Sequence, residues 1–266
     1  MRIPNHIGII PDGNRRWAKG QQLGKEKGYE KGLLPGLEAF KECERLGVKE
    51  ISIYGFTVDN TKRPTEQRLA FTKCCVEMVN MLKNENCEIL VAGNRESDMF
   101  PIELSDLTTR KTFGTGGLKV NFLINYSWEW DLKANKSVTY YNTADISRID
   151  LIIRWGGMRR LSGFLPVQSV YADFYVVDDF WPDFKREHIE NAINWYQHQD
   201  VTLGGWKNIA LTIDLVERAI IFYFLLYSPN FSSIVYSCKA VLLFAPEPII
   251  SFVVPKPLFL TALKAL

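Results

Sequence analysis

The sequence lacks several features that would place it in a common class of protein. Its 32 basic residues are almost balanced by 30 acidic ones, and the net charge of +2 disfavours a general nucleic-acid binder. Neither the P-loop pattern nor the GxGxxG pattern occurs, which disfavours nucleoside-triphosphate and dinucleotide folds. An anionic ligand must therefore be held by a local cluster of arginines, and we expect no nucleic-acid partner.

Cysteine and histidine are too few and too scattered for a zinc site. The five cysteines have no CxxC spacing and no nearby histidine: Cys43, Cys74, Cys75, Cys87 and Cys238. Reduced thiols of an intracellular protein are the better interpretation. The apolar run at residues 7–10 is too short for a signal peptide. We therefore expect a cytoplasmic protein.

The chain does contain a series of short apolar runs that are rich in β-branched residues. Six of them lie at residues 7–10, 50–56, 87–92, 118–124, 151–155 and 174–177. Runs that are apolar throughout are typical of strands buried on both faces, as in a parallel sheet. Helical patterns at 32–46 and 66–82, and a helix capped by Asp183 and running to Trp195, lie between or after them. This alternation predicts an α/β domain.

Polar residues follow the first run directly, in the order Asp12-Gly13-Asn14-Arg15-Arg16. Glycine lets main-chain amides approach an anion closely, and the planar guanidinium group fits phosphate oxygens. Taken alone, the stretch is explained equally well by an Asp-Gly turn with solvated arginines.

Two further loops favour anion binding over a simple turn with solvated arginines. The loop after the second run holds Thr57, Asp59, Asn60 and Arg63, and the loop after the fifth holds Arg154, Gly156, Gly157, Arg159, Arg160 and Ser162. Because parallel strands end at one side of a sheet, these loops are expected to converge there. Two arginine clusters indicate two phosphate-bearing groups, or one diphosphate gripped from both sides. Asp12 suits Mg²⁺ bound together with substrate phosphates, with Asp173 as a second ligand.

Several separated stretches together resemble the cis-prenyltransferase family, which includes undecaprenyl diphosphate synthase and dehydrodolichyl diphosphate synthase. They are HIGIIPDGNRRWAKG, YGFTVDNTKRP, LKVNFLINYSWEWD and IDLIIRWGGMRRLSGFLPVQSVYADFYVVDDFWPDF, in the family's order, within roughly the first two hundred residues. The resemblance implies a six-stranded mainly parallel sheet flanked by helices, a homodimer, and an apolar tunnel. It also implies Mg²⁺-dependent condensation of an allylic diphosphate with isopentenyl diphosphate to form a Z double bond.

The resemblance implies roles for individual residues. Asp12 is expected to position Mg²⁺ and to assist departure of the allylic diphosphate. That diphosphate is expected to be cradled by Gly13, Asn14, Arg15, Arg16 and, in the place of a family arginine, Lys25. Isopentenyl diphosphate is expected to bind Arg154, Arg160 and Ser162.

Further roles concern the proton and the metal. Asn60, supported by Thr57 and Arg63, is expected to help remove a proton from isopentenyl diphosphate, and Asp173 stands in the place of a metal-linked glutamate. The aromatic face of Trp17 either stabilises an allylic cation by a cation–π contact or packs in the core.

The departures from the family pattern bear on the reaction. Tyr29, which we place among the substrate-binding residues, stands where the family usually has histidine, and Thr61 replaces a common tryptophan. Two alternatives therefore stay open. One is head-to-middle condensation of allylic diphosphates, or prenyl transfer to another acceptor. The other is a non-catalytic partner subunit of a prenyl synthase, which the retention of Asp12 disfavours.

The last part of the chain differs in composition, and we divide the sequence into a catalytic domain, 1–205, and an apolar extension, 206–266. Residues 219–238 carry no charge, but Ser228, Pro229 and Asn230 interrupt them, so a clean transmembrane helix is disfavoured. Two interpretations remain. The extension either lies at a membrane surface as a hairpin or interfacial segment, or covers the dimer or the tunnel mouth.

Overall fold

The six predicted strands are confirmed and form the centre of the fold. The computed structural model describes residues 2–133 and 141–200, so the extension at 206–266 lies outside the described residues. The strands are β1 (His6–Ile10), β2 (Glu50–Tyr54), β3 (Cys87–Ala92), β5 (Leu118–Leu123), β6 (Leu151–Arg154) and β7 (Asp173–Val176). Each bound lies within two residues of its predicted place.

A seventh strand corrects the predicted count of six. Lys111–Phe113 (β4) pairs antiparallel with β3 at the edge of the sheet, whose order is β4-β3-β5-β2-β1-β6-β7. Its first two residues are exposed, so no apolar run marked it in the sequence. The other pairs are parallel, as predicted. The sheet therefore has an amino end, where its parallel strands begin, and a carboxyl end, where they finish.

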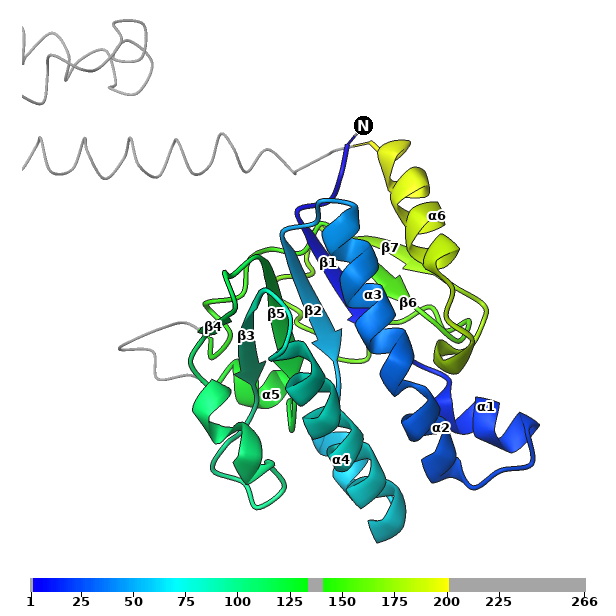
Figure 1. The fold of residues 1–266 in the computed structure, drawn as a ribbon, viewed down its shortest axis with the longest axis vertical. Helices are drawn as coiled ribbons and strands as arrows, with labels where there is room; N and C mark the ends of the chain where they lie inside the picture. The colour runs from blue at the N-terminus through cyan, green and yellow to red at the C-terminus, as the bar shows by residue number, and fades with distance from the viewer. Residues whose placement is uncertain (1, 134–140, 201–266) are drawn as a thin grey trace, which may run out of the picture. The chain divides into compact units, whose positions relative to one another are not determined.

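Helices cover one face of the sheet and extend beyond its carboxyl end (Figure 1). The covering helices are α3 (Leu33–Arg45), α4 (Thr65–Leu82) and α6 (Arg186–Gln197), and the first two match their predicted ranges. Beyond the carboxyl end of β1 lie α1 (Asn14–Gly20) and α2 (Lys25–Lys31). The remaining helices are α5 (Trp128–Asp131) and three 3₁₀ turns, η1 (Val58–Lys62), η2 (Ile102–Leu107) and η3 (Trp181–Asp183).

The predicted cap of the last helix is wrong. The helix α6 begins at Arg186, with Lys185 as its N-cap, and Asp183 instead ends the short turn η3. Its carboxylate Oδ1 accepts a hydrogen bond of 2.8 Å from the indole Nε1 of Trp17. Because that bond joins segments far apart in the sequence, local helix-capping rules could not reveal it.

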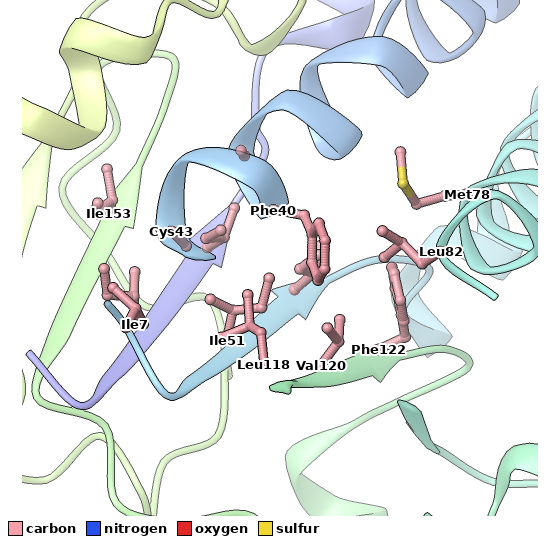
Figure 2. Packing of buried hydrophobic residues seen from close by; sticks show 14 of the residues in the cluster. Ile7, Phe40, Cys43, Ile51, Met78, Leu82, Leu118, Val120, Phe122 and Ile153 are labelled. Carbon is pink, nitrogen blue, oxygen red and sulfur yellow. The ribbon is translucent and has the colours of Figure 1, made fainter. Parts of the chain in front are cut away.

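Apolar side chains are buried on both faces of the sheet, as the continuous runs predict. On the helical face, Ile7, Ile51 and Phe40 belong to the larger core cluster, and all are fully buried (Figure 2). On the other face, Ile152 and Phe164 belong to a second cluster, which loops cover. Burial of one such side chain stabilises the fold by about 1.5–3 kcal/mol, so the two clusters hold the strands firmly in place.

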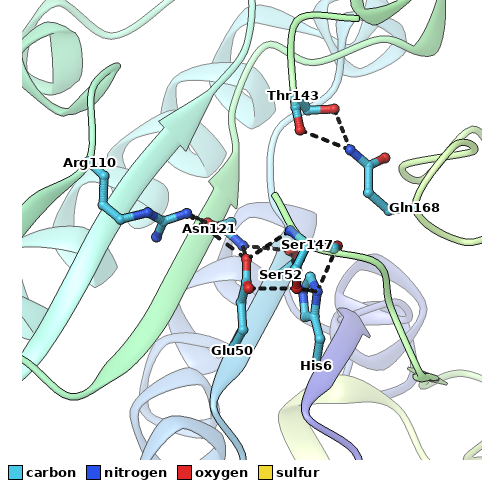
Figure 3. A network of polar contacts seen from close by, with 8 residues as sticks. All are labelled: His6, Glu50, Ser52, Arg110, Asn121, Thr143, Ser147 and Gln168. Carbon is cyan, nitrogen blue, oxygen red and sulfur yellow. Dashed lines mark hydrogen bonds and ion pairs between the residues drawn. The ribbon is translucent and has the colours of Figure 1, made fainter. Parts of the chain in front are cut away.

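A largely buried polar network joins β1, β2 and β5 towards the amino end of the sheet (Figure 3). We call it the amino-end network; its members are His6, Glu50, Ser52, Arg110, Asn121 and Ser147. The carboxylate of Glu50 accepts hydrogen bonds of 2.7 Å from Asn121 Nδ2 and from Ser147 Oγ. The imidazole of His6 bonds to Ser52 Oγ at 2.9 Å. These contacts join β1, β2 and β5 to the loop that precedes β6.

Candidate active site

The three predicted loops line one cleft at the carboxyl end of the sheet. Its volume is about 440 Å³, and its walls come from the segments after β1, β2 and β6 together with α1, α2 and α4. The predicted residues that line it are Asp12, Gly13, Asn14, Arg15, Arg16, Lys25, Tyr29, Thr57, Asp59, Asn60, Arg63, Arg154 and Ser162. The structure therefore brings together residues that are far apart in the sequence.

Asp12 is the carboxylate at the centre of this cleft. Its Oδ2 accepts a hydrogen bond of 2.7 Å from Arg154 Nη2, and its Oδ1 lies 3.3 Å from Arg16 Nη2. Burial pushes the pKa of Asp12 upward, but the hydrogen bond and charge of Arg154 outweigh burial and hold this pKa below its ordinary value. About a third of the side chain remains exposed. Asp12 is therefore an accessible, ionised carboxylate between two guanidinium groups.

Glycine at position 13 is required by the local backbone. Gly13 has a φ of 102°, and a Cβ there would lie 2.5 Å from the ring of Phe180. The turn brings the main-chain amide of Gly13 to Asp12 Oδ1, at 2.6 Å, and starts α1 at the next residue. It also directs Arg16 across to the third loop, where its Nη1 donates to the carbonyl of Gly156 at 2.8 Å.

Several buried polar atoms near the cleft have no hydrogen-bond partner within residues 2–133 and 141–200. They are Asn14 Oδ1, Arg15 Nε, Arg154 Nε and Arg16 Nη2, the last of which has only the ion pair with Asp12. A buried guanidinium nitrogen without an acceptor is costly, and such groups in native proteins generally meet water or a ligand. An anion that accepted hydrogen bonds from Arg15 and Arg154 would satisfy both. The donor set of the cleft therefore fits a phosphate-bearing ligand.

Arg154 organises the third loop. It is the last residue of β6 and is buried, and its Nη1 donates to Ser162 Oγ at 3.0 Å and to the carbonyl of Arg160. The side chain of Arg160 is exposed and does not line the cleft, contrary to its predicted place beside Ser162. What Arg160 supplies here is its carbonyl oxygen, which fixes the guanidinium of Arg154.

The second loop adds groups from the far side of the cleft. Thr57 precedes η1, which also contains Asn60. The charge of Asp59 is compensated by Lys62 at 2.7 Å, and both side chains are largely exposed. Arg63 Nη1 donates to the hydroxyl of Tyr29 at 2.8 Å. Tyr29, at the position where histidine was expected, therefore holds Arg63 in place.

Sequence reasoning missed six lining residues: Ile10, Pro11, Lys19, Tyr54, Gly55 and Phe71. Three of them, Lys19, Tyr54 and Phe71, bring a charged or aromatic side chain. Lys19 lies on α1 one turn after Arg15 and Arg16, so helical spacing was a usable signal for it. Tyr54 is the last residue of β2, and its hydroxyl donates to the carbonyl of Ser162 at 2.9 Å. Phe71 lies within α4, and nothing in its sequence neighbourhood indicates the site.

Two other predicted site residues lie away from the cleft. Trp17 does not line it, because its indole is tied to Asp183. Asp173 begins β7 and pairs with Leu151, whereas Arg154 pairs with Val176 three residues later. At about 3.3 Å per residue, Asp173 lies about 10 Å towards the amino end. Within one chain Asp173 is therefore not placed beside Asp12, and its role as a second metal ligand stays a prediction.

The charge of the cleft suits anions with a bound divalent ion. Two acidic side chains, Asp12 and Asp59, face six basic ones, which are Arg15, Arg16, Lys19, Lys25, Arg63 and Arg154. Within the described part of the chain, no group of three or more His, Cys, Asp or Glu residues is arranged so that it could hold a metal ion. Mg²⁺ commonly binds through one or two carboxylates and substrate phosphates, so a single accessible Asp12 fits an ion held mainly by the substrate.

An apolar pocket of about 70 Å³ adjoins the polar cleft. It lies between α2, α3, α4 and the strands β2 and β5. The residues common to the linings of cleft and pocket are Pro11, Asn14, Tyr29, Gly55 and Phe71. The rings of Tyr29 and Phe71 stack with centroids 4.5 Å apart and planes 9° from parallel. A ligand can therefore place a charged end in the cleft and a short apolar end in the pocket.

The sequence is similar to those of several known proteins. Residues 10–204 match the prenyltransferase family described as undecaprenyl diphosphate synthase. An isoprenyl transferase from Chromobacterium violaceum is 33% identical over 223 residues, covering 76% of this chain and 88% of that protein. An isoprenyl transferase from Clostridium perfringens is 34% identical over 235 residues, covering 77% and 92% respectively.

A solved structure confirms the fold. Lavandulyl diphosphate synthase from Lavandula x intermedia, in complex with dimethylallyl diphosphate, superposes with a TM-score of 0.65 at 20% identity. The alignment covers 76% of this chain and 98% of that one. The arrangement of sheet and helices described above is therefore that of a known prenyl diphosphate synthase fold.

Proposed function

We infer the reaction from the family to which this chain belongs, the isoprenyl transferases of the undecaprenyl diphosphate synthase type. The chain is a prenyltransferase, an enzyme of isoprenoid biosynthesis that makes prenyl diphosphates. We propose that it condenses an allylic diphosphate with isopentenyl diphosphate, depends on Mg²⁺, and forms a Z double bond. The observation that carries this proposal is the ionised Asp12 between Arg16 and Arg154 in an arginine-rich cleft beside an apolar pocket.

The proposed reaction breaks one bond and forms another. The allylic C1–O bond breaks, and its electron pair leaves with the diphosphate. The terminal double bond of isopentenyl diphosphate then forms a carbon–carbon bond to C1. A proton leaves the adjacent carbon of the isopentenyl unit, its C–H electrons form the new double bond, and the released diphosphate takes the proton. The products are a prenyl diphosphate five carbons longer and inorganic diphosphate.

The residues of the cleft would act on the charge that develops on the departing diphosphate. We assign the allylic diphosphate to Gly13, Asn14, Arg15, Arg16 and Lys25. A preorganised donor of this kind is worth about 3 kcal/mol in a transition state. Arg15 lines the cleft, and its Nε has no acceptor among the described residues, which supports its assignment to this ligand.

The isopentenyl diphosphate is assigned to the third loop. Arg154 and Ser162 line the cleft there, and their mutual hydrogen bond of 3.0 Å fixes both groups. Asn60, with Thr57 and Arg63 near it in the lining, would orient the isopentenyl group for loss of its proton. Asn60 cannot itself be the base at neutral pH, because an amide has no free basic nitrogen.

Asp12 is the residue that we assign to Mg²⁺, together with diphosphate oxygens. When bound, the ion would neutralise the charge that builds on the leaving group. The protein's own contribution is to keep Asp12 ionised, through Arg154, and accessible on the cleft side. The apolar pocket would keep water from an allylic cation, which water would otherwise capture.

One observation favours a second candidate, condensation with a different acceptor. The side chain of Arg160, which the family resemblance assigns to isopentenyl diphosphate, is exposed and lies outside the cleft lining. Fewer cations than expected therefore face that substrate. In this alternative, a second allylic diphosphate or another prenyl acceptor takes its place.

The assembly and location of the enzyme are further proposals. We propose a homodimer in the cytoplasm, with membrane contact through residues 206–266. Among residues 2–133 and 141–200, no helix combines the length and apolar character needed to cross a bilayer. Light scattering of the purified protein would test the dimer. Sedimentation with lipid vesicles, compared with a chain ending at Gly205, would test the membrane contact.

The central test uses full-length protein with Mg²⁺, dimethylallyl diphosphate and labelled isopentenyl diphosphate. We expect a labelled prenyl diphosphate, its loss on adding EDTA, and a loss of at least about 100-fold in the Asp12→Ala variant. Asp106→Ala, at an exposed position away from the cleft, is the matched control and should keep full activity. Product formed without isopentenyl diphosphate would favour the second candidate, and no product with any acceptor would contradict both.

A further inference from the structure

We propose that this enzyme takes a five-carbon allylic diphosphate and stops after one condensation, because Met78 closes its apolar pocket. This inference rests on the proposed function and specifies the substrate and product of the same site. Its basis is the size of the pocket, the aromatic neck at its entrance and the side chain that ends it.

The neck is formed by Tyr29 and Phe71, which contribute to the linings of both cleft and pocket. Their stacked rings leave little freedom to either side chain, and Tyr29 is only 4% exposed. The hydroxyl of Tyr29 is also held by Arg63 at 2.8 Å. Swinging Tyr29 aside would break both the stacking and this hydrogen bond. The neck is therefore a fixed wall, and a prenyl chain must fit past it.

The space beyond the neck is small. The pocket measures about 70 Å³, whereas an engineered protein cavity that binds benzene, a six-carbon molecule, measures about 150 Å³. The pocket therefore has room for the apolar end of a five-carbon group whose diphosphate lies in the cleft. It has no room for a second five-carbon unit without movement of its walls. Those walls belong to a close-packed core, where such movement is costly.

Met78 lines the pocket between α3 and α4, seven residues along α4 from the neck residue Phe71. It lies on the same face of α4 as Phe71, Cys74 and Cys75, and it is 7% exposed. A Cβ added to Gly36 on α3 would lie 2.3 Å from the Met78 methyl group, so this methyl group packs directly on the glycine. Beyond Met78, on the same helix, comes the fully buried Leu82 of the main core (Figure 2).

This geometry predicts a single condensation. After the first reaction, the new diphosphate end belongs to the former isopentenyl unit. A second round requires that this end move to the allylic position, and the prenyl chain must then advance five carbons deeper. Met78 and the core behind it occupy that space. The ten-carbon product is therefore released rather than extended.

The first experiment needs no variant. Full-length wild-type enzyme is given Mg²⁺, labelled isopentenyl diphosphate and an allylic primer of five, ten or fifteen carbons, and the products are separated by length. We expect the five-carbon primer to give a kcat/KM at least about tenfold above the others, since small differences in pocket fit already discriminate by this factor. The main product should be the ten-carbon diphosphate.

A matched pair of variants tests the role of Met78. Met78→Ala and Leu82→Ala remove equal numbers of side-chain atoms from neighbouring turns of α4, but only Met78 lines the pocket. With Met78→Ala, we expect the ten-carbon primer to gain at least about tenfold relative to the five-carbon one, and fifteen-carbon product to appear. With Leu82→Ala, the product length should not change. Thermal unfolding of both variants establishes that each is folded.

The outcomes separate this inference from the proposed function. Efficient use of a fifteen-carbon primer, or long products, would overturn the inference while leaving the prenyltransferase reaction intact. Equal lengthening by Met78→Ala and Leu82→Ala would overturn the role of Met78. Absence of product with every primer would overturn the proposed condensation itself, and the inference with it.

Discussion

The two ends of the parallel sheet use the same kinds of side chain in opposite ways. At the amino end, the carboxylate of Glu50 is 6% exposed and accepts from Asn121 and Ser147. At the carboxyl end, Asp12 is a third exposed, and buried nitrogens of Arg15 and Arg154 have no partner among the described residues. One buried atom of the amino-end network, Arg110 Nη1, also has no hydrogen-bond partner among the described residues. Paired polar groups at one end serve stability, and unpaired ones at the other indicate a ligand.

The largest effect is expected at the carboxyl end. Arg154→Ala removes both the hydrogen bond to Asp12 and a cation that the proposed reaction needs. We expect kcat/KM to fall by about 10²–10³, as for loss of one preorganised transition-state donor. Because Arg154 holds the pKa of Asp12 down, the acid side of the pH–rate profile should also move to higher pH.

The control for this prediction is a neighbouring arginine. Arg159 is exposed and lies outside the cleft lining, so Arg159→Ala should retain activity and its pH profile. Arg154→Lys restores the charge without the planar fork and should recover only part of the loss. Equal activities of wild type and Arg154→Ala would remove the central assumption about the cleft.

The next largest effect is expected at the amino end, on stability rather than turnover. Glu50→Ala removes the acceptor of Ser147 Oγ and one of the two acceptors of the buried Asn121 amide nitrogen, which keeps only Ser52 Oγ. We expect the free energy of unfolding to fall by about 3 kcal/mol, while kcat of the folded fraction changes little. Urea unfolding and steady-state kinetics on the same preparation measure both quantities.

A matched carboxylate sharpens this comparison. Glu103 is exposed on η2, and Glu103→Ala should change the unfolding free energy by less than about 0.5 kcal/mol. If Glu50→Ala lowered kcat strongly in a protein of normal stability, it would be wrong to assign stability to the amino end of the sheet and catalysis to the carboxyl end.

A smaller effect is expected from Tyr29→Phe. This change removes the hydroxyl that accepts from Arg63 but keeps the ring that stacks on Phe71. The loss of one hydrogen bond to a charged group corresponds to about 1.5–3 kcal/mol at most, and water in the cleft should replace part of it. We expect KM for the allylic substrate to rise by about threefold to tenfold, with product length unchanged. A longer product would show that the hydroxyl, and not the ring, sets the neck.

The sequence predicted the buried strands and their parallel arrangement better than the edge strand and the positions of individual side chains. Continuous apolar runs located six strands, because a strand buried on both faces leaves a strong hydrophobic signal. The strand β4 escaped, since a short, exposed edge strand has no such signal. The three loops were correctly expected to converge, because parallel topology alone places their strand ends together.

What the sequence could not reveal depends on the direction of individual side chains. The exposed side chain of Arg160 and the indole of Trp17 tied to Asp183 both follow from tertiary contacts. The place of Asp173 at the start of its strand, in contrast, was already evident from the apolar run that follows it. The neck residue Phe71 lies far along the chain from Tyr29, so no spacing rule joins them. Motifs place residues at a site, and packing decides which of them face it.

The smallest effect, on stability against pH, is expected from His6 at the amino end. Burial lowers the pKa of His6 below its ordinary 6.5, although Glu50 and Asp150 oppose this shift. The unfolded chain therefore binds this proton more readily, and the free energy of unfolding should fall as pH drops below 6.5. The pKa of Glu50 is also below its ordinary 4.5, because its hydrogen bonds and the charge of His6 outweigh burial. A second loss of stability should therefore begin as pH falls through that value.

Urea unfolding between pH 7 and about 5 measures the first loss of stability. The His6→Asn variant should flatten this pH dependence, and the control His198→Asn should not. A wild-type stability that is flat over this range would show that His6 is not held neutral in the folded protein.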